Sequence, residues 1–107
     1  AVACKAWRWM GGMQLVHLPT HAGATGYYFR VPQAGYISLP SEYPDLADPA
    51  TLGCLLTLVR EAWDDPYLCC VGDRETGWRL DGYAAVEDIH SYRSEAEALV
   101  RALEAAP

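Results

Sequence analysis

The chain has 107 residues, of which 51% are hydrophobic and 21% charged, a composition typical of a globular domain. No apolar run approaches the roughly 18 residues that a membrane helix needs, and the first residues do not form a signal-type segment. We therefore expect a cytoplasmic protein with one hydrophobic core and no association with membranes.

The formal net charge of −6 is distributed unevenly along the chain. Residues 1–41 contain Lys5, Arg8 and Arg30 and no acid, whereas residues 42–107 contain all 14 acids and five arginines. An acidic segment repels phosphate and attracts basic surfaces over a long range. The distribution therefore favours a basic protein over nucleic acid as a partner.

The first third of the chain is predicted to be β structure. Apolar and aromatic residues gather in residues 13–18, 27–31 and 36–39, between turns that contain glycine and proline, and this pattern predicts a three-stranded meander. Residues 40–49 then contain three prolines and three acids, which disfavour regular structure. We expect that segment to be an irregular surface connection.

Two helices are predicted, each with its own start signal. Asp48 followed by Pro49 begins the first helix, which runs to about Trp63. Ser94 with Glu97 three residues later forms a capping box for the second helix. Apolar residues at helical spacing predict core-facing stripes, namely Leu52, Leu55, Leu56, Val59 and Trp63 in the first helix and Ala96, Leu99, Val100 and Leu103 in the second.

Between the helices, residues 67–71 and 78–80 are predicted to be strands, with a further strand in residues 83–90. Trp78 and Leu80 should share one face of their strand, with Arg79 and Asp81 on the other. The resulting order is β-β-β-α-β-β-(β)-α. It predicts an α+β fold, a single small domain of mainly antiparallel sheet with two helices.

Two segments resemble small uncharacterised proteins that phages and prophages encode. They cover residues 44–63 and 94–107, and the stretches that carry the resemblance read PDL, DPATLGCLL, REAW, SEAEALV and AAP. The resemblance implies an accessory gene of mobile-element origin, a class that includes small binders of host proteins. It implies no catalytic or binding residue.

The sequence contains no signature of a known enzyme class. It lacks a nucleophile elbow, a Walker-type loop and a dinucleotide-binding fingerprint. Cys4, Cys54, Cys69 and Cys70 are expected to be reduced thiols, because unpaired cysteine often serves as a small buried hydrophobe. We expect no enzyme, no cofactor and no metal. The alternative is a small metal- or thiol-dependent enzyme that uses Cys69, Cys70 and a histidine.

Our leading hypothesis is a non-enzymatic accessory protein that binds a host protein, which would be basic or itself bind nucleic acid. The candidate partner-binding residues are one aromatic and basic group and two acidic pairs: Trp7, Arg8, Trp9 and Arg30, then Asp64 and Asp65, then Glu87 and Asp88. Aromatic side chains stack on unpaired bases and arginines bind phosphate, so a nucleic-acid-binding module through the first group is a further hypothesis. A homodimer through Trp7 or Trp9 is equally open.

Overall fold

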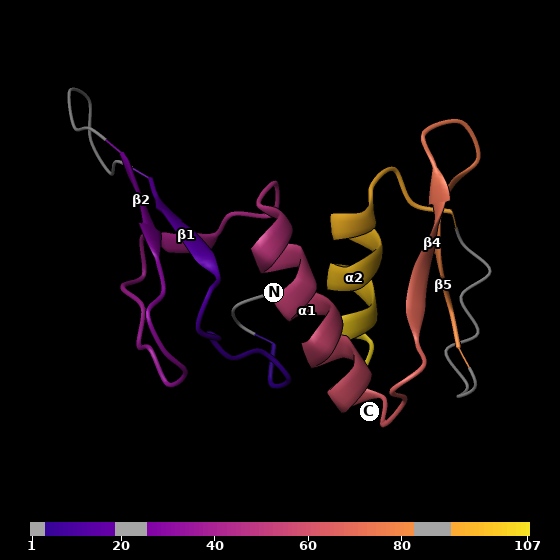
Figure 1. Ribbon diagram of the computed structural model, residues 1–107, viewed down its shortest axis with the longest axis horizontal. Helices are drawn as coiled ribbons and strands as arrows, with labels where there is room; N and C mark the ends of the chain where they lie inside the picture. Colours follow the sequence, from indigo (N-terminus) through magenta and orange to yellow (C-terminus); the bar gives the residue numbers. More distant parts are fainter. Residues whose placement is uncertain (1–3, 19–25, 83–90) are drawn as a thin grey trace. The chain divides into compact units, whose positions relative to one another are not determined.

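The computed structural model describes residues 4–18, 26–82 and 91–107, in which the chain is an α+β protein with two helices and two antiparallel sheets (Figure 1). The elements are β1 Gln14–His17, β2 Tyr27–Arg30, β3 Glu42–Pro44, α1 Pro49–Ala62, β4 Cys69–Asp73, β5 Gly77–Asp81 and α2 Glu95–Glu104. This order confirms the predicted fold class, and the further strand predicted in residues 83–90 lies outside the described residues. Of the helices described, neither is long and apolar enough to cross a membrane.

The described residues group into two compact units. The N-terminal unit is residues 8–54, and the C-terminal unit is residues 4–7 together with residues 55–107. The boundary falls within α1, between Cys54 and Leu55. It therefore does not coincide with the change of charge near residue 41.

The N-terminal sheet has the order β2-β1-β3, with β1 antiparallel to both neighbours. The predicted meander with a third strand in residues 36–39 is wrong. Instead the chain turns at Leu39, whose carbonyl oxygen accepts the Glu42 N–H at 3.0 Å, and Glu42–Pro44 then lies beside β1. Pro44 is tolerated because β3 is an edge strand, where a missing N–H breaks no ladder bond. The segment predicted to be irregular thus contains a strand.

Both ends of α1 are closed by local hydrogen bonds. The Asp48 carboxylate accepts the Thr51 N–H at 2.9 Å, which confirms the predicted cap. At the other end, Asp64 has a positive φ of 51°, and the N–H groups of Asp64 and Asp65 donate to the carbonyl oxygens of Glu61 and Arg60. This is a Schellman motif with aspartate in the left-handed position that glycine usually occupies.

The buried face of α1 differs from the predicted stripe. Its fully buried residues are Thr51, Leu55, Leu58 and Val59, at helical spacing, whereas Leu52, Leu56 and Trp63 are only partly buried. Thr51 belongs to this buried face although it is polar. Its hydroxyl accepts the Gln14 N–H at 2.8 Å and donates to Asp48 at 2.9 Å, so a polar residue occupies a core position.

In the C-terminal unit, α2 lies between the second half of α1 and the β4–β5 hairpin (Figure 1). The Trp63 indole N–H donates to the Ala102 carbonyl oxygen at 2.8 Å. The Ser94 hydroxyl accepts the Glu97 N–H at 3.1 Å, which confirms the predicted cap of α2. Leu99 and Leu103 are buried as predicted, but Ala98 and Ala102 complete the buried face in place of Ala96 and Val100.

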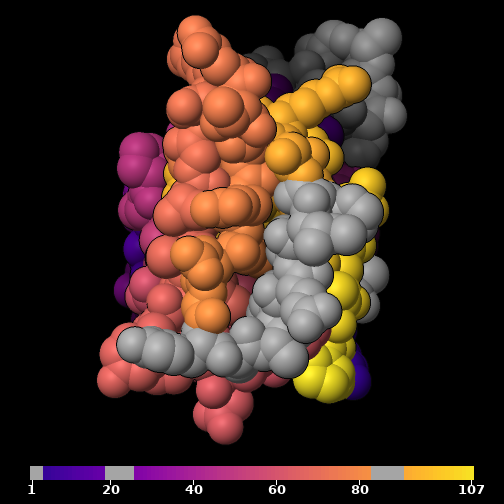
Figure 2. Space-filling model, turned by 90° about the vertical axis from the view of Figure 1, so that its right-hand side faces the viewer, coloured from indigo at the N-terminus to yellow at the C-terminus, as the bar shows by residue number. Residues whose placement is uncertain are grey.

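The β4–β5 hairpin, which Figure 2 views from its outer side, is built around a short loop. Asp73 and Gly77 pair at the end of the strands, and the Asp73 carboxylate accepts the N–H groups of Glu75 and Thr76 at 2.8 and 2.7 Å. Gly77 has φ of 83°, which closes the loop without a Cβ clash. Leu80 is buried while Arg79 and Asp81 are exposed, so the predicted alternation is confirmed.

Candidate functional site

The register of the N-terminal sheet divides its side chains between two faces. Val16 on β1 lies opposite Tyr28 on β2 and opposite Tyr43 on β3, so these three side chains cross the sheet on one face. Leu18 follows Val16 by two residues, and its N–H continues the ladder to the Ser41 carbonyl oxygen at 3.2 Å, so it shares that face. We call Val16, Leu18, Tyr28 and Tyr43 the tyrosine row.

The tyrosine row is open to solvent. Tyr28 is 67% exposed, Leu18 51% and Tyr43 47%. Contiguous apolar surface of this kind is typical of interaction sites, and tyrosine is enriched there because its ring packs while its hydroxyl forms a hydrogen bond. The row is therefore the candidate site that the fold itself assembles.

The opposite face of the sheet carries a buried carboxylate. Glu42 is 4% exposed, and it accepts the hydroxyls of Tyr27 and Tyr36, each at 3.1 Å, and the Leu39 N–H at 2.8 Å. Burial raises the pKa of Glu42, but these hydrogen bonds and the nearby His17 outweigh that effect and lower it. Burial and the bond to Glu42 raise the pKa of both tyrosines.

His17 completes this face. Its ring stacks on Tyr27 with centroids 4.5 Å apart, and its Nδ1 lies 3.0 Å from the Ser41 hydroxyl oxygen. A serine, a histidine and a carboxylate also form hydrolytic triads, but there the carboxylate accepts a bond from the histidine. Here the hydrogen bonds described for Glu42 come from Tyr27, Tyr36 and Leu39. Glu42 and His17 therefore fix the positions of the Tyr27 and Tyr36 rings.

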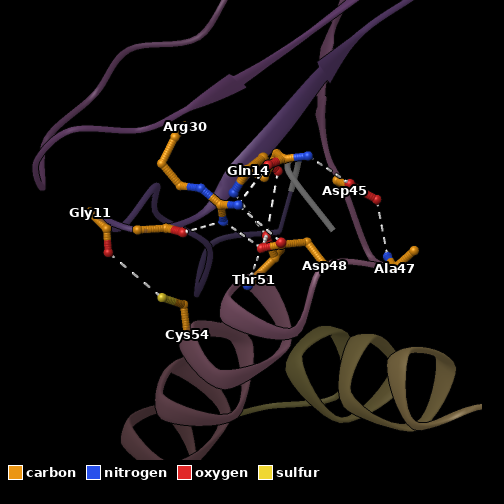
Figure 3. A network of polar contacts seen from close by, with 9 residues as sticks. Gly11, Gln14, Arg30, Asp45, Ala47, Asp48, Thr51 and Cys54 are labelled. Carbon is orange, nitrogen blue, oxygen red and sulfur yellow. Dashed lines mark hydrogen bonds and ion pairs between the residues drawn. The ribbon is translucent and has the colours of Figure 1, made fainter.

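Arg30 joins β2 to the start of α1 (Figure 3). Its guanidinium donates to both oxygens of Asp48, at 2.6 and 3.1 Å, and also to Gln14 Oε1 and the Gly12 carbonyl oxygen. The bond to Arg30 is the main cause that lowers the pKa of Asp48 to about 2. A guanidinium held in this way has few donors left for a phosphate, so Arg30 is a structural residue of this unit.

The predicted aromatic and basic group is divided between the two units. Trp9 is buried, and its indole N–H donates to the Ser38 hydroxyl at 2.8 Å. Its contact with a partner stays a prediction. Trp7 is partly buried and belongs to the C-terminal unit, whereas Trp9 and Arg30 belong to the N-terminal unit. Arg8 lies exposed in the N-terminal unit.

Of the two predicted acidic pairs, the structure describes Asp64 and Asp65. Asp64 is exposed but forms the left-handed end of α1, and Asp65 is buried, with its carboxylate accepting the Tyr67 N–H at 3.0 Å. The carboxylate of Asp65 lies against Gly82, where a Cβ atom would collide with it. Asp65 is therefore not a surface residue. Glu87 and Asp88 lie outside the described residues.

The four cysteines are free thiols, and Cys69 and Cys70 follow each other on β4. Cys69 lines a cavity of about 250 Å³ with Tyr67, Asp81 and Gly82. His17 belongs to the other unit, and His21 and His90 lie outside the described residues. Within the described part of the chain, no three histidine, cysteine or acidic side chains are placed to hold a metal ion.

Sequence reasoning missed the tyrosine row. Tyr28 lies in a predicted strand but is not among the predicted partner-binding residues, and Tyr43 lies in the segment expected to be irregular. The alternation of Val16 and Leu18 was a usable signal for a shared face, but the row exists only because Glu42–Pro44 pairs with β1. No family model matches the chain, and no curated protein or solved structure shows significant similarity to it.

Proposed function

We propose that this chain is a non-enzymatic accessory protein of the phage type, which acts by binding a protein of the bacterial host through the tyrosine row. The observation that carries the proposal is the exposure of Tyr28, Leu18 and Tyr43 on one face of a hydrogen-bonded sheet. Side chains held by a rigid sheet lose little entropy on binding. A sheet face of this kind therefore suits specific contact with another protein.

The partner is expected to present an apolar surface with hydrogen-bond acceptors at its rim. The rings of Tyr28 and Tyr43 would be covered, and their hydroxyls would need acceptors once water is excluded. Because the net charge is −6, a basic partner would associate faster than an acidic one, above all at low salt. The same charge opposes binding to phosphate.

Affinity capture with matched variants tests the proposal. The wild-type chain, Tyr43→Ala and Tyr67→Ala would each be used to capture proteins from a bacterial lysate. Tyr67 is a suitable control because it is 68% exposed, as much as Tyr28, but belongs to the C-terminal unit. A protein that wild type and Tyr67→Ala retain and that Tyr43→Ala loses supports the proposal. A protein captured equally by all three would place the contact elsewhere.

Nucleic acid is the competing ligand, and it has a separate test. Labelled single- and double-stranded oligonucleotides would be titrated with the wild-type chain and with Arg8→Ala. We expect no binding at moderate salt, because Arg30 is committed to Asp48 and Trp9 is buried. Salt-sensitive, micromolar binding that Arg8→Ala abolishes would overturn the proposal.

A further inference from the structure

The face that carries the tyrosine row continues into a row of polar side chains. Gln14 lies opposite Arg30 in the register of β1 and β2. On the other side of β1, the Asp45 N–H donates to the Gln14 carbonyl oxygen at 2.7 Å, which extends the pairing beyond Pro44 and places Asp45 opposite Gln14. Gln14 and Val16 are two residues apart on one strand, so their side chains share a face. We call Arg30, Gln14 and Asp45 the polar row.

The side chains of the polar row are joined to one another (Figure 3). The Arg30 guanidinium donates to Gln14 Oε1 at 2.7 Å, and the Gln14 amide nitrogen donates to Asp45 Oδ2 at 3.2 Å. The Ala47 N–H donates to the other oxygen of Asp45 at 3.1 Å. These bonds hold the Asp45 carboxylate at a fixed position, on the same face as Tyr43 and two residues after it.

The two aspartates at this end of the face differ in how their oxygens are used. Asp48 accepts two hydrogen bonds from Arg30 and two from Thr51. Asp45 is partly exposed, and the bonds described for it come from neutral groups, the Gln14 amide and a backbone N–H. A carboxylate has about four acceptor sites, so Asp45 can still accept from a cation. One arginine and two aspartates leave this end of the face with a formal charge of −1.

We propose that the partner places an arginine of its own against Tyr43 and Asp45, with apolar side chains on Leu18 and Tyr28. This inference rests on the proposed function and names the chemistry of the partner at that site. Tyr43 is 47% exposed. A guanidinium is planar and weakly hydrated, so it can stack on the Tyr43 ring and donate to Asp45 at the same time. The ammonium of lysine is compact and strongly hydrated, and it suits this pair of contacts less well.

The same arrangement opposes an anionic ligand. A phosphate or an acidic side chain at Tyr43 would meet the negative charge of Asp45. Arg30 does not offset this charge, because its guanidinium is bound in two hydrogen bonds to Asp48. The polar row therefore gives the tyrosine row a preference for one sign of charge.

Titration of the isotope-labelled full chain with short capped peptides tests the inference, with amide NMR shifts as the readout. The probe is the tripeptide Leu-Arg-Leu, and its matched control contains citrulline, which keeps the shape of arginine without the charge. We expect shifts at Tyr43 and Asp45 and a dissociation constant of about 1–10 mM for the arginine peptide. The citrulline peptide should bind about three- to tenfold more weakly. Equal binding of the two peptides would overturn the inference, and so would no detectable binding at about 20 mM.

Two aspartate variants place the charge that the peptide recognises. Asp45→Asn removes the charge and keeps an acceptor for Gln14, so it should weaken the arginine peptide about three- to tenfold and leave the citrulline peptide unchanged. Asp81→Asn is the matched control, because Asp81 is exposed and belongs to the C-terminal unit. It changes the net charge equally and should affect neither peptide. Circular dichroism would check that both variants are folded, and equal weakening by both would overturn the inference.

Affinity capture separates a failure of this inference from a failure of the proposed function. A host protein that Tyr43→Ala loses and Asp45→Asn retains would overturn the arginine contact and leave the tyrosine row as the binding site. A host protein that wild type and Tyr43→Ala capture equally would overturn the proposed function, even where the tripeptide binds beside Asp45. Loss of the same protein by Tyr43→Ala and Asp45→Asn, but not by Asp81→Asn, is the result that we expect.

Discussion

Arg30 and Asp48 meet through two parallel hydrogen bonds, Nη1 to Oδ2 at 2.6 Å and Nη2 to Oδ1 at 3.1 Å. One of the Asp48 oxygens also accepts the Thr51 N–H, so a single carboxylate both caps α1 and fixes β2. Residues 8–54 contain two arginines and three carboxylates, Glu42, Asp45 and Asp48, so their formal charges nearly cancel. The apparent positive charge of the first 41 residues is therefore not a property of the folded unit.

Acid should destabilise the protein through Asp48. Its pKa is lowered from 3.8 to about 2, so the stabilisation is present above pH 3.8 and is lost as the pH falls toward 2. Asp48→Asn preserves the helix cap but removes the charge. The free energy of unfolding, measured by urea denaturation from pH 5 to pH 2, should fall more steeply for wild type than for this variant. Parallel curves would contradict the prediction.

Leu58 should be the more sensitive of two neighbouring leucines on α1. It is fully buried, so Leu58→Ala should cost about 2–5 kcal/mol of unfolding free energy. Leu56 is partly exposed, and Leu56→Ala should cost less than half as much, because part of its side chain already contacts water. Urea denaturation of both variants measures the difference. Equal losses would show that Leu56 faces the core after all.

Asp64→Gly should stabilise the protein. Asp64 has a positive φ of 51°, a conformation that costs side chains with a Cβ atom free energy and costs glycine little. A carboxylate at a helix C-terminus also opposes the helix dipole. We expect a gain of about 0.5–1 kcal/mol. Asp64→Ala is the control, since it removes the charge but keeps the Cβ atom, and a similar gain from alanine would attribute the effect to charge.

Glu42→Gln should lower the free energy of unfolding of the protein. The amide retains one acceptor where the carboxylate has two, so bonds from Tyr27, Tyr36 and Leu39 compete. A loss of about 1–3 kcal/mol is expected. Spectrophotometric titration should show a lower ionisation pH for two tyrosines, because the carboxylate helps to raise their pKa. Unchanged tyrosine ionisation would exclude the bonds to Glu42.

Local chemistry made the helices predictable. The caps at Asp48 and Ser94 each involve a bond to a residue three positions later, so the information lies within one turn. The buried face of α1 was harder to predict from the sequence. Thr51 is buried where its hydroxyl accepts the N–H of Gln14, 37 residues away in the chain.

The candidate site depends on contacts that are distant in sequence. Aromatic residues are recognisable in the first third of the chain, but their exposure is decided by which strand lies beside β1. Glu42–Pro44 contains a proline and an acid, a composition that disfavours a strand, and only pairing with β1 makes it one. Trp9 and Tyr28 are therefore similar by sequence, yet one is buried and the other exposed.

The order β2-β1-β3 places the earliest strand of the chain at the centre of its sheet. During synthesis β1 can pair with β2 once Arg30 has emerged from the ribosome, but its second edge stays open until Pro44 has followed. At about 5–20 residues per second this interval lasts roughly one to three seconds. The nascent chain thus carries an incomplete sheet over this interval.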